Sequence, residues 1–202
     1  MNVETPHGPA LVHLHPVAEP VALLALGHGA GGGVGAVDLV RVRQIANERG
    51  LSVALVEQPY RVAGRRSPAP PGQLDTAWTA VMADVRGDLP LIVGGRSLGA
   101  RVACRTAAAT GAAAVLCLAF PVHPPGRPEK SRLEELDAVD VPVLVVQGTS
   151  DPFGMPPPAP GREVVQIEGA DHGLKRDLDT LAAAVGDWLQ SVTRSPRAPA
   201  GT

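Results

Sequence analysis

A serine between two glycines lies where a buried apolar stretch meets a helix-forming one. In "VGGRSLGAR", Gly95, Ser97 and Gly99 have the spacing G-x-S-x-G. Between a strand and a helix this spacing is typical of a nucleophile elbow, in which glycines allow a sharp turn and the serine hydroxyl is exposed. The start of the helix also supplies N–H groups for a developing oxyanion. The pattern predicts a nucleophilic serine, with an ordinary glycine-rich turn as the alternative.

A serine hydroxyl needs a general base, and that base needs a carboxylate to orient it. Asp151 follows one apolar stretch of the chain, and His172 follows the last one before the closing helix. The order Ser97, Asp151, His172 is the chain order of the α/β-hydrolase triad. Asp140 fits less well because it precedes its strand, and Asp171 would point away from the neighbouring histidine ring. We therefore predict Ser97, Asp151 and His172 as catalytic residues.

A glycine-rich loop, "LGHGAGGGVG", follows an earlier apolar stretch and allows two interpretations. Gly27, Gly29 and Gly32 have the spacing G-x-G-x-x-G of a dinucleotide phosphate loop, and Glu57 lies about where a ribose-binding acid is expected. That interpretation leaves the three predicted catalytic residues unexplained. In a hydrolase, the same loop places a backbone N–H beside the nucleophile, where it binds a carbonyl oxyanion.

An oxyanion hole of this kind needs two backbone donors. The predicted donors are Leu98, which follows the nucleophile, and Ala30 in the glycine loop. Residues beside these donors, or at the end of a strand, are predicted to contact substrate: Gly29, Gly31, Arg96 and His123. We predict no metal, because the pair His13 and His15 lacks a third ligand at a suitable spacing. The predicted chemistry also requires no cofactor.

The elements that would position these residues alternate between short apolar stretches and stretches of helical period, which predicts an α/β fold. Strands are predicted at 10–17, 21–27, 51–58, 89–95, 112–120, 141–148 and 162–169, with helices near 36–49, 74–85, 98–110 and 133–136 and from 178 onward. The segment "PYRVAGRRSPAPPG" is predicted to be a proline-rich loop. Helical crossovers imply a mostly parallel central sheet with helices on both faces, and sites on such sheets lie at the carboxyl ends of the strands.

The composition is that of one domain with a substantial core. Among 202 residues, 18 are basic and 20 are acidic, without long runs of one charge, so nothing favours nucleic acid or a membrane surface as partner. We expect residues 1–194 to form the domain and 195–202 a disordered tail. Cys104 and Cys117 are expected to be reduced core thiols. The first residues lack the pattern of a signal peptide, so a cytoplasmic location is expected.

Several segments together carry a family resemblance: "GHGAGGG", "QPYRVAGRRSPAP", "GGRSLGAR", "FPVHPPGRPEK", "VQGTSDPFG" and "GADHGLK". With them, the chain resembles small serine α/β-hydrolases without a cap domain, of the dienelactone-hydrolase-like kind. It looks most similar to the subgroup that includes testis-expressed hydrolase-like proteins and a subunit of the NSL histone acetyltransferase complex. The resemblance implies the α/β-hydrolase fold and a serine hydrolase site at the three predicted catalytic residues.

The resemblance also bears on the substrate. Dienelactone hydrolase uses a cysteine nucleophile, whereas this chain has Ser97, so that substrate is not carried over. Cleavage of a small ester or thioester is predicted, with a short acyl group, because no long insertion follows "FPVHPP" to form a lid. Some members of the subgroup act as interaction proteins, so a non-catalytic protein on a hydrolase scaffold is the alternative function. The expected partner is a small acyl compound, and no oligomeric state is predicted.

Overall fold

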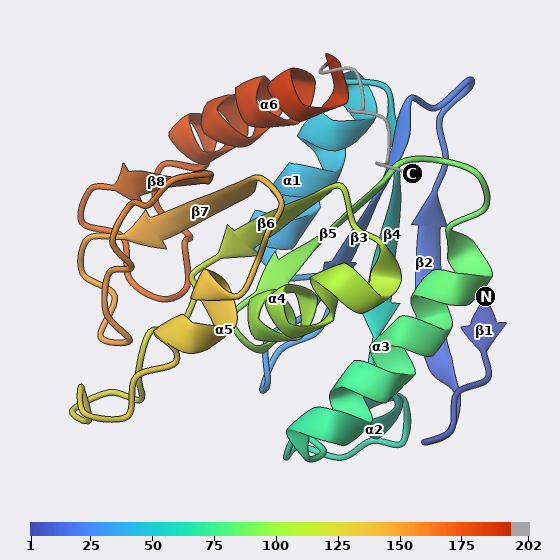
Figure 1. The fold of residues 1–202 in the computed structure, drawn as a ribbon, viewed down its shortest axis with the longest axis horizontal. Coiled ribbons are helices and arrows are strands. Elements are labelled where there is room, and N and C mark those ends of the chain that lie inside the picture. Colours follow the sequence, from blue (N-terminus) through green and yellow to red (C-terminus); the bar gives the residue numbers. More distant parts are fainter. Residues whose placement is uncertain (195–202) are drawn as a thin grey trace.

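The computed structural model describes residues 1–194, so the predicted tail at 195–202 lies outside the described residues. Within this range the strands form one eight-stranded sheet of order β1-β2-β4-β3-β5-β6-β7-β8 (Figure 1). The first two strands are antiparallel additions, and the other six run parallel, as predicted. The strands are β1 (Asn2–Val3), β2 (Ala10–His15), β3 (Ala22–Gly27), β4 (Leu51–Glu57), β5 (Leu91–Arg96), β6 (Ala114–Leu118), β7 (Val143–Gly148) and β8 (Arg162–Ile167).

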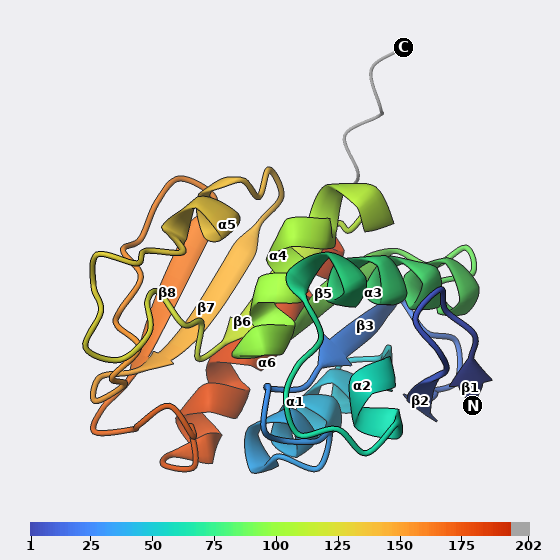
Figure 2. The same cartoon turned by 90° about the horizontal axis from the view of Figure 1, so that it is seen from below.

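Helices cover both faces of the sheet, which confirms the predicted fold class. Figure 2 shows α1 (Val37–Glu48) and α6 (Leu178–Arg194) on one side, and α3 (Pro71–Val85), α4 (Leu98–Thr110) and α5 (Leu133–Asp137) on the other. Side chains of a strand alternate between the faces, so each parallel strand feeds two cores. In β3, for example, Leu24 packs in the core beneath α1 and α6, whereas Leu23 packs in the core beneath α3 and α4.

Two elements were missed by the sequence prediction, the two-residue strand β1 at the start of the chain and a short helix after β4. The proline-rich segment after β4, expected to be a loop throughout, begins with a short helix, α2 (Pro59–Val62). Pro59 occupies the first helical position, where the missing N–H costs no hydrogen bond. The following residues up to Pro70 then form the expected irregular connection.

The strand β2 accounts for His13 and Glu57, two side chains that could have indicated a metal site and a ribose site. His13, on β2, lies opposite the end of β4, and its Nε2 is 2.7 Å from Glu57 Oε1. Glu57, the acid that could have bound a ribose, is therefore paired with a histidine of the neighbouring strand. Within residues 1–194, no group of three or more His, Cys, Asp or Glu side chains is arranged to hold a metal ion.

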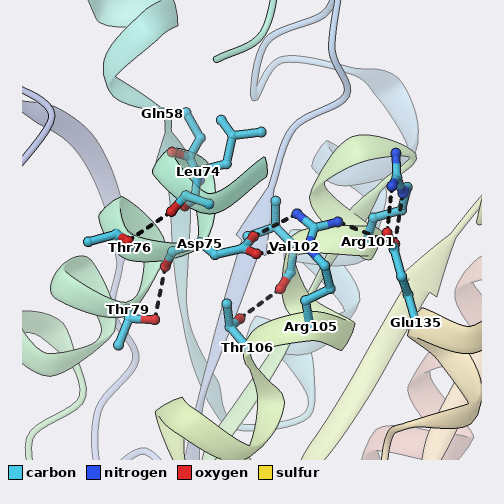
Figure 3. Close-up of polar contacts among 11 residues, drawn as sticks. Gln58, Leu74, Asp75, Thr76, Thr79, Arg101, Val102, Arg105, Thr106 and Glu135 are labelled. Atoms are coloured by element: carbon cyan, nitrogen blue, oxygen red, sulfur yellow. Dashed lines mark hydrogen bonds and ion pairs between the residues drawn. The ribbon is translucent and has the colours of Figure 1, made fainter. Parts of the chain in front are cut away.

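A network of ion pairs joins α3, α4 and α5, the three helices on one face of the sheet (Figure 3). Arg105 of α4 makes two hydrogen bonds to Asp75 of α3, of 2.6 and 2.8 Å, and reaches Glu135 of α5 at 3.2 Å. Arg101 adds two more bonds to Glu135. Burial opposes ionisation of Glu135, but the hydrogen bond and charge of Arg101, aided by Arg105, lower the pKa of its carboxyl. The network ties α4 to its neighbours α3 and α5 on this face of the sheet.

Two further sequence expectations concern the core and membranes. Cys104 and Cys117 are free and buried, with their Sγ atoms 3.5 Å apart, in agreement with the expected core thiols. None of the helices in the described part of the chain has both the length and the apolar character needed to cross a bilayer.

Candidate active site

The serine between β5 and α4 lies in a strained turn. Ser97 has φ 53° and ψ −107°, a left-handed conformation that costs a non-glycine residue about 1–3 kcal/mol. The glycines on either side allow the turn to press against the end of β3. A Cβ at Gly95 would lie 2.4 Å from the Gly27 oxygen, and one at Gly99 would lie 2.3 Å from the same atom. Both glycines of the G-x-S-x-G spacing are therefore required by the close backbone contact with the end of β3.

The structure brings the three predicted catalytic side chains together in one chain of hydrogen bonds. His172 Nε2 is 2.9 Å from Ser97 Oγ, and His172 Nδ1 is 2.8 Å from Asp151 Oδ2. Because a carboxylate only accepts hydrogen bonds, Nδ1 carries the proton of the neutral ring, and Nε2 accepts the serine hydroxyl. The Asp151 carboxylate is buried, whereas His172 is partly exposed. This arrangement suits proton transfer from serine to histidine.

Two residues that the sequence analysis missed hold the acid and the base. Gln147, buried in β7, donates from Nε2 to Asp151 Oδ2 at 2.8 Å and to the Gly154 carbonyl at 2.8 Å. The Phe153 N–H donates to Asp151 Oδ1 at 2.9 Å, and the Phe153 ring stacks on His172 with centroids 4.1 Å apart. A signal for Gln147 was visible, because an amide inside the apolar strand "VPVLVVQG" needs buried partners.

Two side chains donate hydrogen bonds to backbone carbonyls of the glycine loop and hold it in place. The Tyr60 hydroxyl donates to the Ala30 carbonyl at 3.0 Å, and His28 Nδ1 donates to the Gly29 carbonyl at 2.8 Å. The second ring nitrogen of His28 accepts the Gln58 N–H at 3.2 Å. Burial lowers the pKa of His28, so its ring stays neutral in this role. A loop-holding role for His28 agrees with its position beside the loop.

The predicted oxyanion donors have N–H groups available. Leu98 is the first residue of α4, and the N–H groups of a helix's first turn have no acceptor within the helix. Within residues 1–194 the Ala30 N–H also makes no hydrogen bond to the protein. The pairing of these two donors around one oxyanion stays a prediction.

Of the predicted substrate contacts, Gly29 lies beside the nucleophile and Gly31 faces open space. A Cβ at Gly29 would lie 3.7 Å from the Ser97 Cβ, so this residue borders the nucleophile. Gly31 is exposed, and a Cβ there would meet no heavy atom within 4 Å; the same holds for Gly32 and Gly33. This part of the loop therefore leaves room above its backbone.

The other two predicted substrate contacts are engaged with protein groups. His123 donates from Nδ1 to the Pro124 carbonyl at 2.9 Å and lies against Gly154, in the segment that follows the acid. Arg96 Nε lies 2.9 Å from Asp38 Oδ2, and a terminal nitrogen of the same guanidinium donates to the His172 carbonyl at 2.8 Å. The sequence analysis expected Arg96 to contact substrate, but in the structure its guanidinium contacts Asp38 and the His172 carbonyl instead.

Asp38 is a further residue of this region that the sequence analysis missed. It lies in the first turn of α1, where an acid is commonly explained by the helix dipole alone. Its carboxylate is fully buried, and burial raises the pKa of Asp38 while the Arg96 charge opposes this rise. A buried carboxylate of this kind depends on its partner.

Comparisons with known proteins agree with this geometry. Residues 20–192 match the sequence model of a family described as an alpha/beta hydrolase domain. A comparison with curated proteins finds no matching sequence.

Solved structures of hydrolases also resemble the chain. A Xanthomonas campestris protein, described as an α/β serine hydrolase without lid, aligns with TM-score 0.77 and 20% identity over 98% of this chain and 95% of its own. Est1E from Butyrivibrio proteoclasticus, with bound ferulic acid, aligns with TM-score 0.77 and 17% identity over 95% and 98%. A dienelactone hydrolase from Anabaena variabilis aligns with TM-score 0.75 and 16% identity over 95% of both chains. At these identities the likeness shows the fold.

Proposed function

Since the chain belongs to the alpha/beta hydrolase domain family, we propose that it is a serine hydrolase that cleaves a small ester or thioester through an acyl-enzyme on Ser97. The observation that carries this proposal is the continuous chain of hydrogen bonds from Asp151 through His172 to Ser97. Each member has the atom that its role requires at hydrogen-bonding distance. The buried acid accepts further hydrogen bonds, from Gln147 and the Phe153 N–H, that fix it in place.

The proposed reaction has two halves. His172 Nε2 removes the Ser97 proton as Oγ attacks the acyl carbonyl, and Asp151 stabilises the resulting imidazolium. The oxyanion of the tetrahedral intermediate is bound by the N–H groups of Leu98 and Ala30. The C–O or C–S bond then breaks, and His172 gives its proton to the leaving alcohol or thiol. In the second half, His172 activates water, which attacks the acyl-enzyme and releases the acid.

The proposed substrate carries a short acyl group. The segment between β6 and α5, residues 119–132, contains no helix or strand that could form a lid. Gly29 and Gly31 are proposed to border the substrate, with His123 farther along the rim. The likeness to Est1E, which was solved with ferulic acid bound, supports a carboxylic ester as the first substrate to test.

Free thiols at Cys104 and Cys117 support a reducing, cytoplasmic location.

Labelling with a fluorophosphonate tests the proposal directly. The wild type is expected to gain one covalent adduct, located on Ser97 by peptide mass spectrometry, because only an activated serine displaces fluoride. Ser97→Ala should take no label, and Ser67→Ala, which changes an exposed serine in the connection after α2, should be labelled like the wild type. A wild type that stays unlabelled would favour the non-catalytic interaction protein, and label that persists in Ser97→Ala would refute the proposal.

The hydrogen bond from Tyr60 to the glycine loop gives a smaller, separate prediction. Tyr60→Phe keeps the ring but removes the donor to the Ala30 carbonyl. One neutral hydrogen bond is worth about 1 kcal/mol, so kcat for a short p-nitrophenyl ester should fall about 2- to 10-fold with KM little changed. Steady-state kinetics measure this. An unchanged kcat would mean that Tyr60 does not set the position of the Ala30 N–H.

A further inference from the structure

A buried ion pair behind the nucleophile takes no part in the proton transfers proposed above. Arg96 is the last residue of β5 and directly precedes Ser97, and Asp38 lies in the first turn of α1. Arg96 Nε and Asp38 Oδ2 are 2.9 Å apart, but neither atom has a partner in hydrogen-bond geometry. The attraction of opposite charges therefore holds this contact. Asp38 Oδ1 is fixed separately by the Leu39 N–H at 2.9 Å.

The other side of the same guanidinium reaches the segment that carries the base. Arg96 donates to the backbone carbonyl of His172 at 2.8 Å, and within residues 1–194 no other group donates to this oxygen. His172 lies in the connection between β8 and α6. The start of this connection is anchored where the Ser150 N–H donates to the Ala170 carbonyl at 2.9 Å. Arg96 provides the next fixed point, at the histidine itself.

The shape of the guanidinium suits this double role. Its planar fork carries donors in several directions, whereas a lysine ammonium is a single point charge on a flexible stem. A Cβ at Gly29 would lie 3.4 Å from a further nitrogen of Arg96, so the guanidinium also packs beneath the glycine loop. One side chain thus contacts the glycine loop, the start of α1 and the histidine segment.

We propose that Arg96, anchored by Asp38, is a positioning residue that fixes the His172 backbone and thereby the distance between His172 Nε2 and Ser97 Oγ. The proposal rests on the proposed hydrolase function. It assigns Arg96 to the protein's own geometry and away from the substrate. A base displaced by about 1 Å loses rate by up to about 100-fold while substrate binding persists, so the effect should fall on kcat.

Four variants separate positioning from plain stability. Arg96→Met removes both contacts but leaves Asp38 buried and unpaired, so Arg96→Lys is the main test because it keeps a cation beside Asp38. Asp38→Asn removes the anchoring charge. Arg101→Met is the matched control: Arg101 has the same exposed side-chain fraction as Arg96, 18%, and pairs with Glu135, away from the base.

The Arg96 and Asp38 variants are expected to lose kcat, whereas the Arg101 control is expected to lose stability. Arg96→Lys should unfold near the wild-type temperature but hydrolyse a short p-nitrophenyl ester, and react with fluorophosphonate, about 10- to 100-fold more slowly, with KM within about threefold. Asp38→Asn should show the same loss of kcat. Arg101→Met should lose stability and keep its kcat. The proposal is overturned if Arg96→Lys has wild-type kcat, because charge at this position would then suffice.

A spectroscopic readout keeps the two proposals apart. The proton on His172 Nδ1 should give a sharp ¹H NMR signal in the wild type and in Arg101→Met, and a broadened or absent signal in Arg96→Lys. A wild type without hydrolysis or labelling overturns the proposed function, whereas this signal still tests the positioning role. An Nδ1 proton signal that is equally sharp in Arg96→Lys overturns the positioning role.

Discussion

Replacing Asp151 with asparagine is expected to lower kcat/KM for a short-chain ester about 10⁴-fold. Three N–H donors converge on this carboxylate, from Gln147, Phe153 and His172. An amide offers one oxygen and one NH₂ group in place of two accepting oxygens. One donor must then face the NH₂ group. If that donor is on His172, the ring rotates or adopts the other tautomer, and Nε2 no longer accepts the Ser97 proton.

Asp171→Asn is the matched control for this variant. Asp171 is the neighbour of His172 in sequence, but it is exposed, and within residues 1–194 its carboxylate accepts only the Gly173 N–H, at 2.8 Å. An asparagine oxygen can accept the same bond, so kcat/KM should stay within about twofold of the wild type. Hydrolysis of p-nitrophenyl acetate by both variants, corrected for folded fraction, measures the contrast. Equal losses in the two variants would show that Asp151 is not the acid of the triad.

The second large effect is expected for Gly99→Ala. The new Cβ would lie 2.3 Å from the Gly27 oxygen and 2.5 Å from its carbonyl carbon. These are backbone atoms of the central strand β3, which cannot move aside as the end of a long side chain can. Overpacking against such a site should lower the free energy of unfolding by about 3 kcal/mol or more. Any folded fraction should label slowly at Ser97, because the start of α4 must shift.

Urea unfolding followed by tryptophan fluorescence measures this effect, since the Trp78 ring packs against Gly27 at the point of collision. Gly33→Ala is the control, because a Cβ there would meet no heavy atom within 4 Å and the backbone needs no positive φ. Its unfolding free energy should differ from the wild type by less than about 1 kcal/mol. A Gly99→Ala protein with wild-type stability and labelling would contradict the close contact between the elbow and β3.

The grouping of Ser97, Asp151 and His172 followed from sequence because three local patterns pointed to one edge of the sheet. Apolar stretches predicted the parallel strands, and Asp151 and His172 each come after the end of such a strand, as Ser97 does. Carboxyl ends of parallel strands share an edge, so no distance information was needed to bring these residues together. The spacing of Gly95 and Gly99 in addition predicted the sharp turn that carries Ser97.

The residues that support the triad were harder to predict because their roles depend on packing between distant segments. Arg96 and Asp38 are far apart in sequence, and a charged residue beside a nucleophile suggests substrate binding as readily as an internal ion pair. Gln147 acts on an acid whose position is known only once β7 and its following turn are placed. The helix α2 was missed because four residues starting with proline carry no measurable period.

Other parts of the sequence analysis stay predictions. The oxyanion roles of Leu98 and Ala30, the substrate contacts of Gly29, Gly31 and His123, and the subgroup within the family all await measurement. The coarse architecture depends on many residues, whereas each of these assignments depends on one or two.

The open glycine loop bears on how this enzyme could acquire new substrates. The backbone of the loop is held from behind by His28 and Tyr60, while Gly31, Gly32 and Gly33 face no neighbouring atom. Side chains added at these three positions would extend from the loop into open space without repacking the core. Under the proposed function, in which Gly31 borders the substrate, single substitutions in this loop should change substrate preference at little cost in stability. The loop is then a starting point for natural divergence and for directed evolution.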